Sequence, residues 1–132
     1  VGYMVANDEL ADLFRNRIQL PYAVNSLSLA IAISLISSPR KVEESISLIK
    51  RERERLYQRL SKIKNIEVYK SDANFLFIKC NTKYGRIVEA LENSKIIVKA
   101  LGNINNYGNC IRMTVGTKKM NDKILSTIKD IQ

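Results

Sequence analysis

The sequence predicts an α+β fold in which helices pack on one face of a small, mostly antiparallel sheet. Three observations predict it. Apolar residues recur at helical spacing through the first half of the chain, short apolar runs bounded by turn residues follow, and the order after residue 65 is strand, strand, helix, strand, strand, helix. A length of 132 residues, with 45% hydrophobic and 27% charged residues, is typical of one soluble globular core.

The N-terminal segments begin with a short apolar run at residues 1–6, which predicts a strand whose neighbours come from elsewhere. The chain is therefore expected to be a piece of a longer protein. Asn7, followed by two acids, predicts a helix that ends before Pro21. Residues 24–37 carry apolar side chains around most of a helical circumference, which predicts a helix covered on several sides.

A long amphipathic helix is predicted from Ser38 and Pro39, a cap and a first-turn proline, to Asn65. Its apolar residues step by threes and fours, with Arg53 in the gap. Acids interleave with the basic residues on its other faces, which favours a solvated surface over a nucleic-acid site. The charged residues placed on these faces are Lys50, Arg51, Glu52, Glu54, Arg55 and Arg59.

The second half of the chain alternates strands with helices. The pattern predicts strands at 66–70, 75–80, 96–101 and 110–116, a helix at 86–93, a loop at 102–109 and a last helix capped by Thr117.

The amino-acid composition excludes several kinds of functional site. The chain has no histidine and two cysteines, Cys80 and Cys110, which are expected to be buried and reduced, so neither a disulfide scaffold nor a metal site is predicted. No glycine pattern forms a nucleotide-binding loop, and no stretch is long and apolar enough for a membrane helix. The net charge of +9 fits nucleic acid, an anionic lipid surface, a phosphorylated small substrate, or simply solvated helix faces.

Two cations are the candidate site residues. Alternation along 110–115 places Ile111 and Met113 on the helix-covered face and Arg112 on the opposite face of a central strand. A permanently charged guanidinium there needs an acid, water or a ligand anion, and its fork suits a carboxylate or phosphate. Lys99 would share this face if the two strands are neighbours, and two cations together favour a dianion.

Five stretches resemble the histidinol-phosphate aminotransferases in order and spacing. The most specific is Cys-Ile-Arg-Met-Thr-Val-Gly-Thr at 110–117, followed by Leu-Pro-Tyr-Ala-Val-Asn-Ser-Leu-Ser at 20–28. The others are 1–7, 50–57 and 73–76. The resemblance spans essentially the whole chain and identifies it as the C-terminal small-domain piece of a fold-type-I enzyme.

The resemblance implies a cytoplasmic homodimer that uses pyridoxal phosphate to transfer an amino group from histidinol phosphate to 2-oxoglutarate in histidine biosynthesis. The lysine that carries the cofactor belongs to the large domain, so this chain is expected to hold no catalytic, cofactor-binding or metal-binding residue and to be inactive alone. Residues 1–37 correspond to a large-domain remnant with connecting helices and 38–132 to the small domain. Arg112 aligns with the arginine that grips the substrate's acidic end. Lys99 occupies a position where many relatives carry an arginine that assists phosphate binding.

Two alternatives remain open at this point. A threonine-phosphate decarboxylase, or another aminotransferase of the same branch, would bind a similar anion with the same cofactor. A small basic RNA-binding module belongs to a different class. The prediction of no nucleic-acid and no membrane partner rests partly on Phe75 and Phe77, which are expected in a strand that is apolar on both faces instead of on an open stacking platform.

Overall fold

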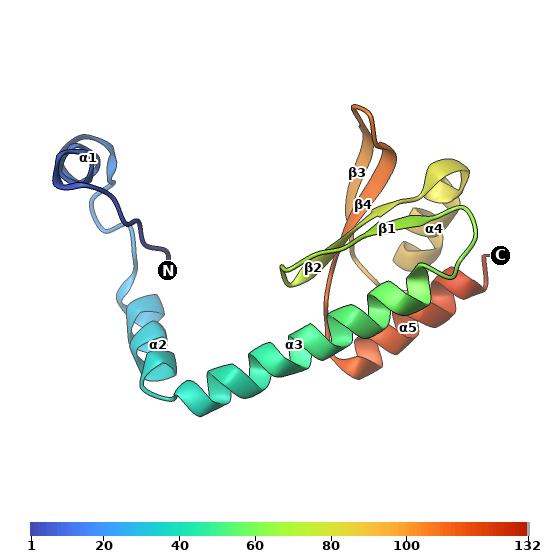
Figure 1. Ribbon diagram of the computed structural model, residues 1–132, viewed down its shortest axis with the longest axis horizontal. Coiled ribbons are helices and arrows are strands. Elements are labelled where there is room, and N and C mark those ends of the chain that lie inside the picture. Colours follow the sequence, from blue (N-terminus) through green and yellow to red (C-terminus); the bar gives the residue numbers. More distant parts are fainter. Residues whose placement is uncertain (132) are drawn as a thin grey trace. The chain divides into compact units, whose positions relative to one another are not determined.

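The computed structural model describes residues 1–131, and the chain forms two compact units. The first is Val1–Glu44 and the second runs from Ser45 onward (Figure 1). Within the described residues, no helix is long and apolar enough to cross a membrane.

The first unit holds short helices with side-chain caps. Asn7 accepts a hydrogen bond from the backbone N–H of Leu10 at 3.0 Å, and Asn25 accepts one from Ser28 at 2.8 Å. These caps satisfy amides that have no partner within the helix. The helical segments are α1 (Asp8–Leu13), the π-helix η1 (Phe14–Ile18) and α2 (Ser26–Ile36).

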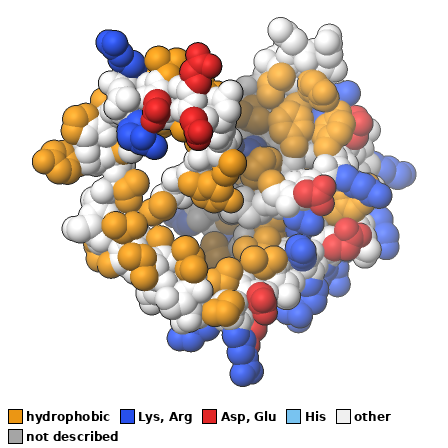
Figure 2. Space-filling view, turned by 60° about the vertical axis from the view of Figure 1, so that its left-hand side comes forward, with side chains coloured by type: hydrophobic (Ala, Val, Ile, Leu, Met, Phe, Trp, Pro, Cys, Tyr) orange, Lys and Arg blue, Asp and Glu red, His pale blue; other side chains and the backbone are white. Residues whose placement is uncertain are grey.

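Residues 1–6, predicted as a strand whose neighbours come from elsewhere, have no regular secondary structure within this chain. A strand needs a neighbour to satisfy its backbone groups, and no other strand of the described chain pairs with it. Helix α2 does form, but the described residues do not supply the predicted cover on several sides: Leu27, Ile31 and Leu35 are 69%, 52% and 49% exposed. Figure 2 shows hydrophobic side chains exposed over much of the face in view.

The second unit is a four-stranded antiparallel sheet with helices. Helix α3 (Pro39–Leu60) begins in the first unit and continues into the second. The sheet order is β1-β2-β4-β3, with every neighbouring pair antiparallel. The remaining elements are β1 (Glu67–Tyr69), β2 (Phe75–Lys79), the 3-10 helix η2 (Asn81–Lys83), α4 (Tyr84–Asn93), β3 (Lys99–Ile104), β4 (Gly108–Thr114) and α5 (Lys118–Lys129).

Helices α3, α4 and α5 supply apolar side chains to one face of this sheet (Figure 1). Burial of this apolar surface is the main stabilising contribution of the unit. The architecture confirms the predicted α+β fold. The fully buried apolar side chains of the described core are Leu56, Leu60, Leu76, Ile78, Cys80, Ile87, Leu91, Cys110, Ile111 and Met113.

Three predicted boundaries are wrong. Helix α3 ends at Leu60 instead of Asn65, and β3 starts at Lys99 instead of residue 96. The segment 102–109 is not a free loop, because most of it pairs as a hairpin between β3 and β4. Its glycines and asparagines make the tight turn possible: Asn106 has a φ of 65°, a left-handed conformation that asparagine tolerates in short hairpin loops.

The prediction that Glu52 lies on a solvated face is also wrong, since it is 3% exposed. Arg55 donates to both of its carboxylate oxygens, at 2.7 Å for the shortest contact, and these hydrogen bonds lower the pKa of Glu52 despite burial. Asn121 donates to Glu52 at 2.9 Å and exchanges two hydrogen bonds with the backbone of Gly116. The network therefore ties α3 to α5 and to the end of β4.

Candidate anion-binding site

Strand β4 places Arg112 on the sheet face opposite the helices. Ile111 and Met113 are 0% and 1% exposed in the core, while Arg112 and Thr114 are exposed on the other side. This is the alternation that the sequence predicts for a strand covered on one face. The uncovered face of the sheet, which carries Arg112, is called the outer face below.

Lys99 lies directly across from Arg112, because β3 and β4 are neighbours and the register pairs these two residues. Cβ atoms of directly opposed residues lie about 4.5–5.5 Å apart, and like charges so placed destabilise a sheet. Among the residues that the structure describes, no carboxylate lies within ion-pair distance of either side chain. An anion placed between them would relieve this repulsion.

Phe75 on β2 gives Arg112 a fixed support. The guanidinium carbon lies 5.1 Å from the centre of the Phe75 ring, within the range of a cation–π contact. Stacking restrains the plane of the guanidinium and leaves its N–H donors free at the edge. Arg112 is therefore partly preorganised to bind a carboxylate or a phosphate with two hydrogen bonds.

A cluster of three aromatic side chains lies near Phe75 and Arg112 on the outer face. The rings of Tyr69, Phe77 and Tyr107 have centroids 5.6–5.9 Å apart in tilted and edge-to-face arrangements. Cys110 accordingly is fully buried although it lies on the outer face, and this burial raises the pKa of its thiol. Strand β2 carries apolar residues on both faces, as expected: Leu76 and Ile78 are buried in the core, while Phe75 and Phe77 are half-buried on the outer face.

Arg53 of α3 binds the turn that precedes β2. Arg53 donates to the backbone oxygen of Ala73 at 2.9 Å and lies 3.7 Å from the carboxylate of Asp72. The next backbone oxygen, that of Asn74, accepts from the N–H of Val115 at 2.8 Å. These contacts fix the start of β2, where the ring of Phe75 lies against Arg112.

The residues present do not form a site for pyridoxal phosphate. A lysine that forms a Schiff base is normally desolvated to lower its pKa, and among the described residues no lysine is buried.

Comparison with known proteins identifies the family to which the chain belongs. The family model described as "Aminotransferase class I and II" matches residues 1–128, nearly the whole chain. The chain belongs to the class I and II aminotransferases. Among curated members, histidinol-phosphate aminotransferase 2 of Archaeoglobus fulgidus is 35% identical over 99% of this chain. The histidinol-phosphate aminotransferase of Thermoanaerobacter pseudethanolicus is 32% identical over the same share.

Solved aminotransferase structures share the fold. The histidinol-phosphate aminotransferase of Clostridium acetobutylicum matches 92% of this chain with a TM-score of 0.76 and 25% identity. The enzyme of Sinorhizobium meliloti, solved in complex with pyridoxal-5'-phosphate, gives a TM-score of 0.77 at 20% identity, which supports the fold alone. The chain spans only 37% and 36% of the two curated relatives, and 36% and 34% of these two solved chains.

The structure thus brings together the two cations that the sequence singled out, and it adds Phe75, which sequence reasoning missed. Phe75 and Arg112 are 37 positions apart, and their contact depends on the register of β2 with β4. The alternation of residues within β2 could have predicted that Phe75 lies on the outer face. It could not have predicted that Phe75 contacts Arg112.

Proposed function

We propose that the intact protein is a pyridoxal-phosphate-dependent aminotransferase, and that Arg112, with Lys99 beside it, binds the acidic end of its substrate. The observation that carries this proposal is the pair of opposed cations on the outer face, which lacks a carboxylate partner among residues 1–131. In this proposal the outer face of the sheet closes one side of a cleft that a large domain completes.

The proposed reaction is transfer of an amino group from histidinol phosphate to 2-oxoglutarate, as part of histidine biosynthesis. The similarity to curated histidinol-phosphate aminotransferases supports this choice. Both reactants are anions: one carries a phosphate and the other two carboxylates, so a forked guanidinium with a neighbouring ammonium suits each of them.

The proposed division of labour assigns residues 38–132 to a small domain and 1–37 to the remnant of a large domain with connecting helices. Pyridoxal phosphate would be held by that large domain, and the intact enzyme would act as a cytoplasmic homodimer. The 132-residue chain by itself would then show no transamination.

The test uses the intact enzyme with Arg112→Ala. A charge-assisted hydrogen bond contributes about 1.5–3 kcal/mol, so kcat/KM for histidinol phosphate should fall about tenfold to a hundredfold. Arg86→Ala, at an exposed position of α4, is the matched control and should leave kcat/KM unchanged. Full activity of Arg112→Ala would disprove the assigned role.

Substrate profiling separates the proposed reaction from its nearest alternative. A structural neighbour, L-threonine-O-3-phosphate decarboxylase of Porphyromonas gingivalis, has the same fold at a TM-score of 0.74 and 18% identity. The intact enzyme should consume histidinol phosphate and 2-oxoglutarate together. Release of carbon dioxide from threonine phosphate, without transamination of histidinol phosphate, would assign it to the decarboxylases instead.

A further inference from the structure

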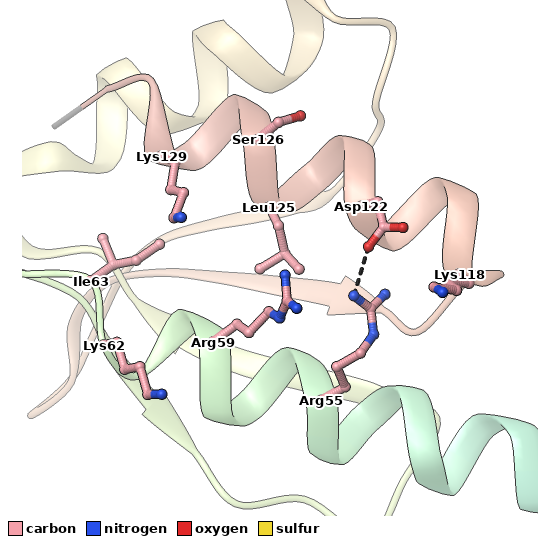
Figure 3. Close-up of a pocket in the computed structure, with 9 residues that line it drawn as sticks. All are labelled: Arg55, Arg59, Lys62, Ile63, Lys118, Asp122, Leu125, Ser126 and Lys129. Atoms are coloured by element: carbon pink, nitrogen blue, oxygen red, sulfur yellow. Dashed lines mark hydrogen bonds and ion pairs between the residues drawn. The ribbon is translucent and has the colours of Figure 1, made fainter.

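A second basic surface lies on the helical side of the sheet, away from Arg112. Helices α3 and α5 border a groove of about 910 Å³ (Figure 3). The buried side chains of Ile63 and Leu125 contribute apolar surface to it. Five basic side chains and one acidic side chain line the groove: Arg55, Arg59, Lys62, Lys118, Lys129 and Asp122.

Asp122, the acid in the groove, shares Arg55 with the buried Glu52, so these three groups together keep one net negative charge. Arg55 donates to Asp122 at 2.6 Å (Figure 3). Its other N–H groups donate to Glu52. This leaves four cations for which, within residues 1–131, no ion pair or side-chain hydrogen bond is found. These four are Arg59 from α3, Lys62 from the turn that follows α3, and Lys118 and Lys129 from α5. The lining of the groove therefore carries more positive than negative charge, and a bound anion would reduce the repulsion among these four cations.

We propose that this groove binds an extended anion with several phosphate groups, such as an inorganic polyphosphate chain. Lys118 and Lys129 are eleven residues apart on one helix, about 16 Å at 1.5 Å per residue. A single phosphate cannot reach both ends of that span. A chain of phosphates can lie along it and contact Arg59 and Lys62 from the opposite wall.

The lining of the groove favours a phosphate chain over a nucleic acid. Single-stranded nucleic acids are held by cations together with aromatic side chains on which the bases stack. The side chains that line this groove include no aromatic residue. The aromatic cluster of Tyr69, Phe77 and Tyr107 lies on the outer face of the sheet instead.

Binding of sodium tripolyphosphate to the 132-residue chain, measured by isothermal titration calorimetry at low salt, tests the proposal. We expect saturable one-to-one binding that weakens as salt is added. Orthophosphate should bind at least about tenfold more weakly, because a single phosphate contacts fewer of the four cations at once. Equal affinity for the two anions, or no saturable binding, would overturn the proposal.

Two double variants with the same loss of charge separate a site from a general effect of net charge. An exposed charge contact changes affinity by roughly two- to fivefold, so K62Q/K129Q should weaken tripolyphosphate binding about tenfold. K50Q/K70Q removes two exposed lysines outside the groove and should change the affinity for tripolyphosphate by less than about twofold. Equal losses in both variants would contradict a defined site. Circular dichroism should show both variants folded, since all four positions are exposed.

Binding of a single-stranded RNA oligonucleotide to the same chain is the last measurement. We expect it to bind the groove more weakly than tripolyphosphate, with the same sensitivity to K62Q/K129Q. If RNA binds more tightly and the loss maps to these two lysines, the groove is a nucleic-acid site and the assigned ligand class is wrong.

Discussion

Asn121 is the buried side chain that joins the end of β4 to helices α3 and α5, and it offers the sharpest test of how this unit is held together. It is fully buried and makes three hydrogen bonds. Two go to the backbone N–H and C=O of Gly116, at 3.0 and 2.9 Å, and the third is donated to the carboxylate of Glu52 at 2.9 Å.

The substitution Asn121→Ala removes all three. Each hydrogen bond to a neutral backbone group contributes about 1 kcal/mol, and the bond to a carboxylate about 1.5–3 kcal/mol. The free energy of unfolding should therefore fall by about 3–5 kcal/mol. A loss of this size lowers Tm by about 10 °C or more in a domain of this size.

Urea unfolding followed by far-ultraviolet circular dichroism at pH 7 measures this loss. Asn93→Ala, at an exposed position of α4, is the control and should change stability by less than about 0.5 kcal/mol. Asn121→Asp keeps the size but places a second carboxylate beside Glu52, so it should destabilise at least as much as alanine. A loss below about 1 kcal/mol for Asn121→Ala would refute the argument from hydrogen bonds.

Three further predictions concern the same unit. Because hydrogen bonds from Arg55 lower the pKa of Glu52 below its usual 4.5, the stability it contributes is present above that pH and lost as pH falls through the lowered value. Wild type and Glu52→Gln should thus differ most in urea unfolding at pH 7 and least near pH 3, and a constant difference would contradict this. Gly116→Ala would place a Cβ 3.1 Å from the Cβ of Met120 and should cost about 1–2 kcal/mol, whereas Gly85→Ala, with no atom within 4 Å, should not destabilise. Burial raises the pKa of Cys80 to about 12, so its thiol should react with a disulfide reagent at pH 8 only in urea, and rapid labelling of folded protein would count against its burial.

The anion-binding face could be predicted in part. Alternation along β4 places Arg112 opposite the core, because side chains of a strand point to alternate faces whatever surrounds them. Its contact with Lys99 could be stated only as a condition, since it depends on which strands are neighbours. The support from Phe75 depends on the register of a second strand pair and could not be derived from local pattern.

The sequence by itself determined the local elements: the caps at Asn7 and Thr117, and the amphipathic spacing of α3 and α5. Helix capping and helical periodicity depend on residues three or four positions apart, so the local sequence is enough to predict them. Only the tertiary structure decided that Glu52 is buried and that residues 102–109 form a hairpin. Glu52 meets Asn121 across 69 positions, and a carboxylate becomes stable inside a protein only when folding brings such donors to it.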